Sequence, residues 1–262
     1  MASVRFLWIR AVDNVHERNR DAPGSVPVRT DFIRSEGTEM TDPASDTAAA
    51  SFEGWPPDAT TFLAELAADN SRAFWTANVE RYRTAVLAPT QALMAALSPE
   101  FGPGRVFRPY VDRRFRPNAE PYRTDAGTLV TGHGGTPYVV VLAAGGLSVQ
   151  VGYQVFDAGQ LRRYRAAIDT AAGDKLDAVF AGLREEGLAP VDVPALTGRP
   201  RGCPADHPRL HLLRLRGLHV DRTWPAGAWL QTGDALVRVR AAWRAAEPLA
   251  DWLDANVGPR EA

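Results

Sequence analysis

The sequence has little cysteine, little lysine and no long apolar run. Cys203 is the only cysteine in 262 residues, which excludes an internal disulfide and a metal site built from several thiolates. Lys175 is the only lysine, so nearly all of the 30 basic side chains are arginines. No apolar stretch approaches the roughly 20 residues that a membrane-spanning helix needs. We therefore expect a cytoplasmic protein without membrane association.

The charge balance argues against a protein that binds polyanions over its whole surface. Residues 1–50 carry six basic and eight acidic side chains, which leaves 24 of the 30 basic and 23 of the 31 acidic ones in the rest of the chain. A body this close to neutral lacks the strongly basic surface of most nucleic-acid-binding proteins. Nucleic acid is therefore the weaker alternative among the possible partners.

The first 50 residues differ in composition from the rest. They mix charged residues with Ser, Thr, Pro and Gly and show no sustained periodicity, so we expect a disordered N-terminal extension. Glu36-Gly37 can be encoded by a purine-rich, ribosome-binding-like run, which suggests that translation starts at Met40. One α+β domain is expected over residues 51–258, with a short tail at 259–262.

Helical periodicity dominates the start of this domain. Asp58 is expected to cap a first helix, Asn70 and Ser71 to break and recap the chain, and Pro89 to kink the second helix or begin a third. Apolar residues of the first two helices recur at three- and four-residue steps, namely Phe62, Leu63, Leu66, Phe74, Trp75, Val79 and Tyr82. The pattern predicts a helical layer before the first strand.

The middle of the chain changes to strand periodicity. Strands rich in Val, Tyr and Phe are expected at Arg105–Asp112, Gly127–Thr131, Pro137–Ala143 and Leu147–Gln154. Gly145-Gly146 predicts a hairpin whose turn has positive φ at both glycines. The alternation from Leu147 to Gln154 predicts one buried and one wetter face. An antiparallel, meander-like sheet follows.

The C-terminal third returns to helices. Asp157 is expected to cap a helix that runs to Ala171, and Gly187 to end a second one. The remaining expected elements are helices at 174–186, 208–215 and 234–256 and a strand at 218–222. The fold class is therefore α+β, with the sheet packed against N-terminal and C-terminal helical layers.

The order and spacing of these residues resemble a known family. The stretch from Asp112 to Thr124, DRRFRPNAEPYRT, is similar to the D-x-RF-x-x-(D/N)-K-x-PYK-T segment of the bacterial family DUF2461, and Asn70–Trp75 is similar to its NN-(K/R)-x-WF segment. The resemblance extends from about Phe52 to Val257. Ala119 and Cys203 depart from the lysine and the aromatic residue usual in that family. The resemblance implies the fold and the compartment, and it implies no particular reaction.

Two segments are rich in arginine. Residues 105–123 contain six arginines against Asp112 and Glu120, and residues 199–222 also contain six against two acidic residues. If the fold brings them together, their planar guanidinium groups suit a small anionic ligand that bears phosphate or carboxylate. Candidate ligand-binding residues are Arg114, Tyr122, Arg123, Arg165 and Arg201. Further structural or pocket candidates are Asp112, Phe115, Trp75 and Asn70.

The same residues also fit a non-enzymatic interaction or structural protein. In that alternative Asp112 pairs with Arg114, and the arginine cluster locks the fold instead of binding a ligand. The sequence identifies no catalytic residue and no protein partner, and we expect no metal and no cofactor.

Four other motifs have simpler interpretations. Gly132–Gly135 lacks the Gly-Lys-Ser/Thr of a phosphate loop and is expected to join two strands. His133 at its tip has no identifiable carboxylate partner. His207 and His211 have the spacing of a helical metal pair, but no glutamate of an HExxH motif lies between them. Cys203 and the tryptophans are expected to serve packing.

Overall fold

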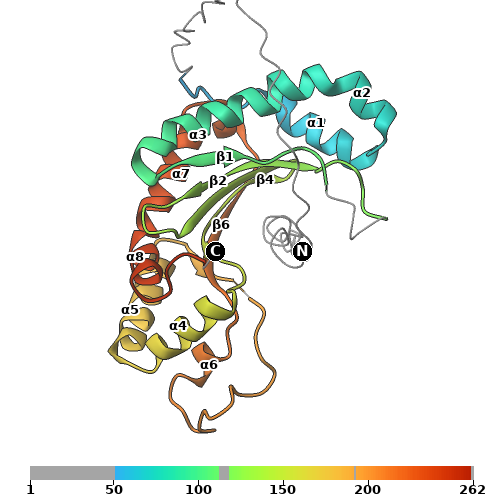
Figure 1. Ribbon diagram of the computed structural model, residues 1–262. Helices are drawn as coiled ribbons and strands as arrows, with labels where there is room; N and C mark the ends of the chain where they lie inside the picture. Colours follow the sequence, from blue (N-terminus) through green and yellow to red (C-terminus); the bar gives the residue numbers. More distant parts are fainter. Residues whose placement is uncertain (1–50, 112–117, 192, 261–262) are drawn as a thin grey trace, which may run out of the picture. The chain divides into compact units, whose positions relative to one another are not determined.

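The computed structural model of the chain describes residues 51–111, 118–191 and 193–260 (Figure 1). The predictions for residues 1–50, including the start at Met40, lie outside the described residues. So do three of the candidate site residues, Asp112, Arg114 and Phe115.

Six strands in the described part form one antiparallel sheet in the order β1-β2-β3-β4-β6-β5. Their bounds are β1 (Gly104–Val106), β2 (Asp125–Thr131), β3 (Pro137–Ala143), β4 (Gly146–Tyr153), β5 (Ala189–Pro190) and β6 (Leu218–Pro225). The first four strands follow one another as a meander. β6 pairs with β4, and β5 lies at the far edge.

The two faces of the sheet differ as the alternation along β4 predicts. Leu147, Val149 and Val151 belong to the main hydrophobic core, together with their neighbours on the flanking strands. Ser148 and Gln150 lie between them and therefore project from the opposite face. The sheet has one face in the core and one face that carries polar side chains.

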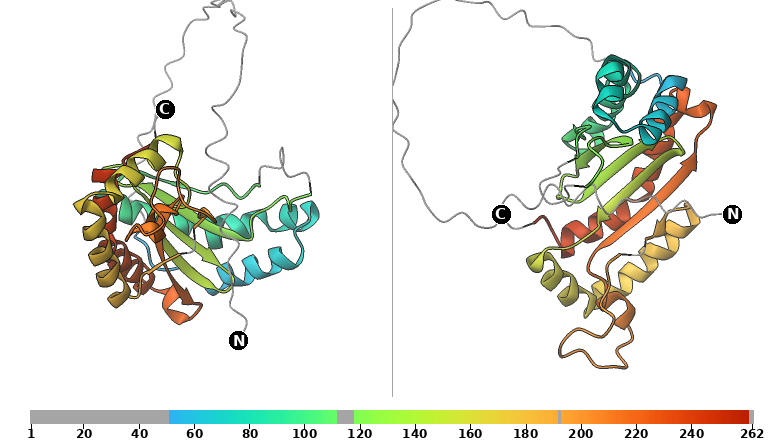
Figure 2. Two further views of the ribbon diagram at one scale, coloured as in Figure 1. Left: turned by 90° about the horizontal axis from the view of Figure 1, so that it is seen from below. Right: turned by 90° about the vertical axis from the view of Figure 1, so that its right-hand side faces the viewer.

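Helices before and after the sheet cover the core face. The helical elements are α1 (Pro57–Ala68), α2 (Arg72–Arg81), the π-helix η4 (Tyr82–Leu87), α3 (Ala88–Phe101), α4 (Ala158–Ile168), α5 (Ala171–Glu185), α6 (Leu210–Leu213), the 3-10 helix η5 (Ala228–Gln231), α7 (Asp234–Ala245) and α8 (Glu247–Asn256). α1 and α3 contact the first three strands, and α7 and α8 contact β4 (Figures 1 and 2). The predicted α+β fold is confirmed. None of the helices in the described ranges has the length and apolarity needed to cross a bilayer.

The N-terminal helices differ in detail from the prediction. Asp58 does not cap α1, which begins at Pro57; its carboxylate instead accepts two hydrogen bonds from the Arg81 guanidinium, which holds the pKa of Asp58 below its usual value. Ser71 caps α2 as predicted, because its hydroxyl accepts from the backbone N–H of Phe74. Before Pro89 the chain widens into η4, in which the N–H of Ala88 donates five residues back, to the Arg83 carbonyl.

From β3 onward, most of the predicted turns and helix caps are present. β3 and β4 form the expected hairpin, although of its two glycines Gly146 alone has a positive φ, at 143°. Asp157 and Gln160 form a capping box at the start of α4. Gly187, with a φ of 71°, follows the end of α5.

Several predicted elements are shorter than expected: the helix after Asp157 ends at Ile168, and the helix expected at 208–215 covers only Leu210–Leu213. In two other elements proline explains the difference. The final helix is divided at Ala246 into α7 and α8, because Pro248 has no N–H to continue the hydrogen bonding of α7. The strand predicted over Arg105–Asp112 ends its regular pairing at Val106. Pro109 follows, and a ladder contact returns at Tyr110.

Candidate functional site

The first candidate site lies where the chain leaves β1 and returns to β2. Residues 107–111 and 118–124 run antiparallel and form what we term the arm. The N–H of Arg123 donates to the Pro109 carbonyl at 2.8 Å, and Tyr110 and Tyr122 form an isolated β-bridge. The arm therefore extends the β1–β2 ladder beyond the sheet and fixes Tyr122 and Arg123 on its returning segment.

Asn70 joins the arm to the N-terminal helices. Its side-chain Nδ2 donates to the Tyr122 carbonyl at 3.0 Å, and its Oδ1 accepts from the Tyr122 N–H at 2.9 Å. Nδ2 also contacts the Leu66 carbonyl at the end of α1, at 3.3 Å. The side-chain amide thus satisfies both backbone groups of Tyr122, as a neighbouring strand would do.

Aromatic rings gather beside this clamp. The rings of Trp75 and Tyr122 are stacked, with centroids 4.5 Å apart and an interplanar angle of 11°. The Tyr82 ring centroid lies 5.0 Å from that of Trp75, and the Tyr110 ring lies 5.8 Å from Trp75 and 5.7 Å from Tyr122. Tyr110 is 59% exposed, whereas the other three rings are buried. The cluster therefore offers one accessible ring on a rigid aromatic base.

Arg123 is held from two sides. Its Nη2 forms an ion pair with Asp125 Oδ1, and its guanidinium lies 5.0 Å above the centroid of the Phe107 ring. The side chain is only 14% exposed. Its Nε is buried and has no hydrogen-bond partner among the described residues. One donor of this guanidinium is therefore unsatisfied in a partly desolvated position.

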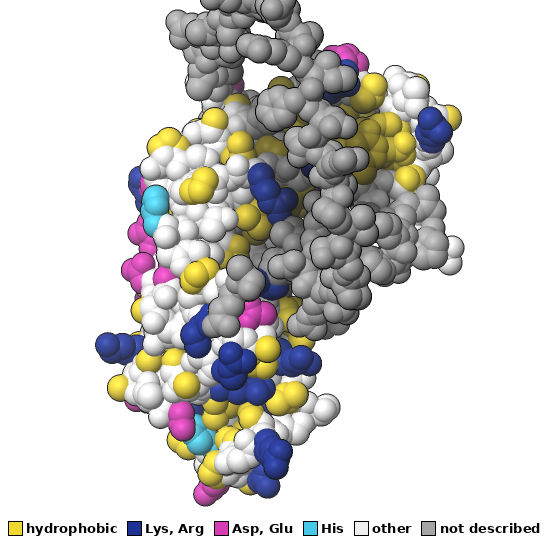
Figure 3. All heavy atoms as spheres, viewed as in Figure 1, with side chains coloured by type: hydrophobic (Ala, Val, Ile, Leu, Met, Phe, Trp, Pro, Cys, Tyr) yellow, Lys and Arg dark blue, Asp and Glu magenta, His cyan; other side chains and the backbone are white. Residues whose placement is uncertain are grey.

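The structure does not bring Arg165 and Arg201 to this place. Arg165 lies on α4, where its Nε donates to the Leu213 carbonyl at 3.3 Å. Arg201 is exposed in the connection between β5 and α6 and makes no hydrogen bond or ion pair with a described residue. α4 and α6 lie at the opposite end of the sheet from α1 and α2 (Figure 1). Figure 3 shows basic side chains gathered over that end and hydrophobic ones near α1 and α2.

The two arginine-rich segments consequently remain apart. The segment 105–123 begins in β1, and the segment 199–222 ends in β6, with three strands between them in the sheet. In the second segment Arg209 forms an ion pair with Asp174 at 2.6 Å, and Arg222 donates to the Glu186 carbonyl while stacking on Trp224. The partners of these two arginines belong to α5, to the residue that follows it and to β6, and none belongs to the arm.

Two titratable residues on the polar face of the sheet were missed by the sequence interpretation. Asp221 and His219 of β6 lie opposite Gln150 and Gly152 of β4. Burial raises the pKa of Asp221 and lowers that of His219 to about 4. Asp221 has no hydrogen bond or ion pair within the described ranges. The signal was the alternation L-H-V-D-R at 218–222, because groups with opposite pKa shifts on one face often mark a site.

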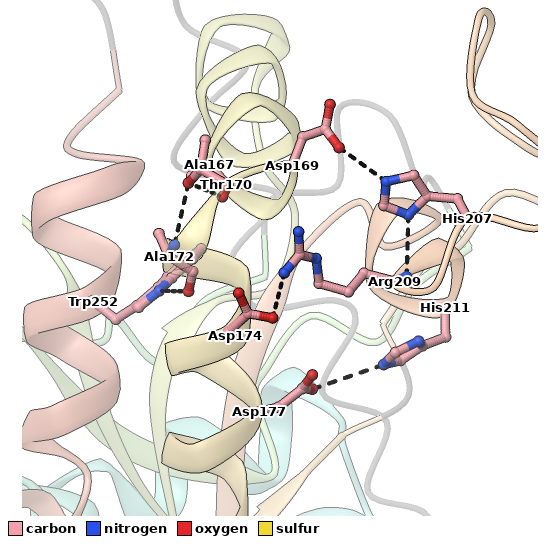
Figure 4. A network of polar contacts seen from close by, with 10 residues as sticks. All are labelled: Ala167, Asp169, Thr170, Ala172, Asp174, Asp177, His207, Arg209, His211 and Trp252. Carbon is pink, nitrogen blue, oxygen red and sulfur yellow. Dashed lines mark hydrogen bonds and ion pairs between the residues drawn. The ribbon is translucent and has the colours of Figure 1, made fainter.

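The histidines of the C-terminal layer have their own partners (Figure 4). The backbone N–H of Arg209 donates to His207 Nδ1 at 3.1 Å, so Nε2 carries the proton that it donates to Asp169 at 2.9 Å. His211 lies 3.9 Å from Asp177. In the part of the chain that the structure describes, no three metal-binding side chains come together.

The remaining sequence motifs lie in loops or in the core of the described structure. Gly132–Gly135 connects β2 to β3, and Asp254 of α8 accepts two hydrogen bonds from Thr136 directly after it. His133 in this connection is exposed. Cys203 is a partly buried free thiol packed against the core. Trp55, Trp75, Trp224 and Trp243 are buried, as expected for packing residues.

Comparison with known proteins gives one match. Residues 58–252, more than half of the chain, match the family model described as conserved hypothetical protein (DUF2461). No curated protein and no solved structure matches the chain. The match spans α1 to α8 and includes the arm. Its description names neither a reaction nor a ligand.

Proposed function

Because the chain belongs to the DUF2461 family of conserved hypothetical proteins, and that family carries no stated activity, we propose a function from the arm alone: the protein binds a small anionic ligand. Arg123 and Tyr122 hold the ligand, and Arg114, in the segment between the two halves of the arm, supplies a second guanidinium. The observation that carries the proposal is the buried Nε of Arg123, which lacks a partner among the described residues.

The guanidinium of Arg123 supports this role through its remaining donors. A guanidinium has five N–H groups, and the ion pair with Asp125 accounts for one nitrogen. A phosphate or carboxylate oxygen would satisfy the other donors and would offset the cost of burying them. The stacking on Phe107 fixes the plane of the guanidinium, so the direction of its free donors is set before a ligand arrives.

The charge and the rings of the arm support it as well. Residues 105–123 have four more basic than acidic side chains, in a body that is otherwise close to neutral. Tyr110 presents an exposed ring next to the Trp75–Tyr122 stack, and such a surface suits the planar part of a ligand.

The test is a ligand screen on the full chain by thermal shift, followed by titration calorimetry. Inorganic phosphate, phosphorylated metabolites, nucleotides and small carboxylates form the panel. We expect one anionic class to raise Tm, and we expect Arg123→Ala and Arg114→Ala to abolish its binding. Arg108→Ala is the matched control, because Arg108 is an exposed arginine of the same segment without a hydrogen bond or ion pair to a described residue. Equal losses in all three variants would indicate only a general charge effect and would contradict a site at Arg123.

A second candidate is the fold-locking role, and the Arg123–Asp125 ion pair favours it. Together with the Phe107 stack and the Asn70 clamp, this pair can serve solely to fix the arm on the sheet. In that case Arg123→Ala lowers the free energy of unfolding, and no ligand of the panel raises the Tm of the wild-type protein. A ligand whose binding is lost in a normally folded Arg123→Lys variant would exclude the purely structural role.

A further inference from the structure

A cavity of about 200 Å³ lies at the end of the sheet opposite the arm. It is bordered by α5, by the segment around β5, by α6 and by the first residues of β6, and it is partly open to solvent. The arm contributes no residue to it. Any ligand of this cavity is therefore independent of the ligand proposed for Arg123.

The wall of the cavity is mainly apolar. Phe180 of α5, Leu212 of α6 and Leu218 of β6 line it and are almost fully buried, and Leu215 adds a partly buried side. An apolar cavity of about 150 Å³ remains free of water and accepts benzene. A cavity of this size and lining therefore suits an apolar body of about one ring.

His219 adds one polar group to the inner wall. It is 8% exposed, and its Nδ1 is buried without a hydrogen-bond partner among the described residues. Burial lowers the pKa of His219 to about 4, although a hydrogen bond to the Tyr153 backbone opposes this shift, so the imidazole is uncharged at neutral pH. A neutral imidazole does not repel an apolar ligand as a charged group would.

Three charged or titratable side chains line the cavity as exposed residues: Asp177, Arg184 and His211. Asp177 Oδ1 lies 3.9 Å from His211 Nε2, and Figure 4 shows these two side chains facing each other across α5 and α6. Arg184 has no ion pair with a described residue. Because it follows Asp177 by seven residues on the same helix face, the two positions are separated by about 10 Å along α5.

We propose that this cavity binds a small monocarboxylate with an apolar body of about one ring, whose carboxylate pairs with Arg184 while the body contacts Phe180 and Leu215. Arg184 is the only lining cation that is free of an ion pair among the described residues, and a guanidinium binds a carboxylate through two parallel hydrogen bonds. The distance along α5 keeps the ligand's charge away from Asp177. Inorganic phosphate has no apolar body to contact Phe180 and Leu215, so it should bind the cavity more weakly than a carboxylate that carries a ring.

The test is NMR titration of the full chain with benzoate, compared with benzyl alcohol and acetate. Benzoate carries both the ring and the charge, benzyl alcohol lacks the charge, and acetate lacks the ring. We expect saturable binding of benzoate, with both other probes weaker by about tenfold or more. Arg184→Gln should weaken benzoate by a similar factor of about ten, and Val193→Trp, which fills the cavity from the β5 side, should abolish binding.

Two controls separate this site from the rest of the molecule. Lys175→Gln removes one positive charge from an exposed position of the same helix that does not line the cavity, and it should leave benzoate binding unchanged. Arg123→Ala removes any benzoate binding at the arm, and the chemical-shift changes of the residues that line the cavity should persist in that variant. Absence of benzoate binding, or binding that survives Val193→Trp in a folded variant, would overturn the proposal. Binding that is equally strong for benzyl alcohol and in Arg184→Gln would overturn the assignment of a carboxylate.

Discussion

Asn70 and Tyr122 are joined by two hydrogen bonds, although 52 residues separate them in the chain. The Asn70 amide accepts from the Tyr122 N–H and donates to the Tyr122 carbonyl, which is the pattern of one residue pair in an antiparallel ladder. Trp75, five residues after Asn70, stacks on the ring of the same tyrosine. The α1–α2 junction therefore fixes both the backbone and the ring of Tyr122, and this positions the neighbouring Arg123.

Replacing Asn70 tests this clamp. Asn70→Ala removes both hydrogen bonds and leaves the partly buried Tyr122 N–H and carbonyl without partners, so we expect it to lower the free energy of unfolding by about 2 kcal/mol. Urea denaturation of the wild-type and variant proteins measures the difference. Asn78→Ala is the matched control, because the Asn78 amide contacts only a carbonyl of its own helix; its effect should stay within about 0.5 kcal/mol. Equal effects of the two substitutions would show that Asn70 does not act as a clamp.

The Arg123–Asp125 ion pair makes a second prediction. Because Arg123 is largely buried and also stacks on Phe107, we expect a double-mutant cycle with Arg123→Ala and Asp125→Ala to give a coupling energy of about 1 kcal/mol. The exposed pair of Arg83 and Glu80 is the control, for which we expect no more than about 0.5 kcal/mol. Denaturant unfolding of the two cycles measures both values. A coupling near zero for Arg123 and Asp125 would mean that the pair does not stabilise the arm, which would weaken the fold-locking alternative.

The sequence predicted the helices and strands well, but it predicted poorly where a helix is interrupted or capped. Alternation from Leu147 to Gln154 identified the residues of β4 that face the core, since a strand places alternate residues on opposite faces whatever packs against it. It did not predict that Gln150 on the other face is also buried. The break between α7 and α8 was missed, because the apolar period continues through Ala246 and only Pro248 interrupts the hydrogen bonding. Asp58 has the side chain of an N-cap but pairs with Arg81 of another helix, a contact that local propensity does not contain.

The candidate site was predicted only in part, because the contacts between distant segments are not contained in the local sequence. Asn70, Trp75, Tyr122 and Arg123, which the sequence named as separate candidates, lie close together in the structure. Arg165 did not join them, because the charge of an arginine carries no information on which carbonyl or carboxylate it will meet in the fold. His219 and Asp221 were overlooked, since their importance depends on burial against β4 and β5 and not on any motif.

Replacing two different glycines by alanine should change the stability in opposite directions. Gly152 of β4 has a φ of 112°, and a Cβ at this position would lie 2.4 Å from the Leu218 carbonyl oxygen, so Gly152→Ala should destabilise the protein by at least about 2 kcal/mol. Gly182 lies on an exposed part of α5 where a Cβ would meet no atom within 4 Å. Gly182→Ala should therefore stabilise by about 1 kcal/mol. Thermal and urea unfolding check both. A stable Gly152→Ala protein would show that β4 and β6 can move apart at this point.

His219 predicts how stability changes with pH. Its pKa is lowered by burial to about 4, below the usual value of about 6.5, so between these values the unfolded chain binds more protons than the folded protein. Stability should therefore rise with pH through this window and be lost as the pH falls. The loss attributable to His219 between about pH 7 and about pH 5 is on the order of 2 kcal/mol. The difference in unfolding free energy between the wild type and His219→Leu should change by this amount.

His133→Gln is the control for this prediction, because it removes a histidine from an exposed loop that lies outside the buried face of β6. The variant should therefore keep the pH dependence of the wild type, whereas His219→Leu should reduce it. NMR titration of the histidine ring protons provides an independent measurement, in which His219 should show no transition above about pH 5 in the folded protein. A folded-state transition of His219 near its usual pKa would mean that water reaches the ring. It would also contradict the uncharged imidazole inferred for the wall of the cavity between α5, α6 and β6.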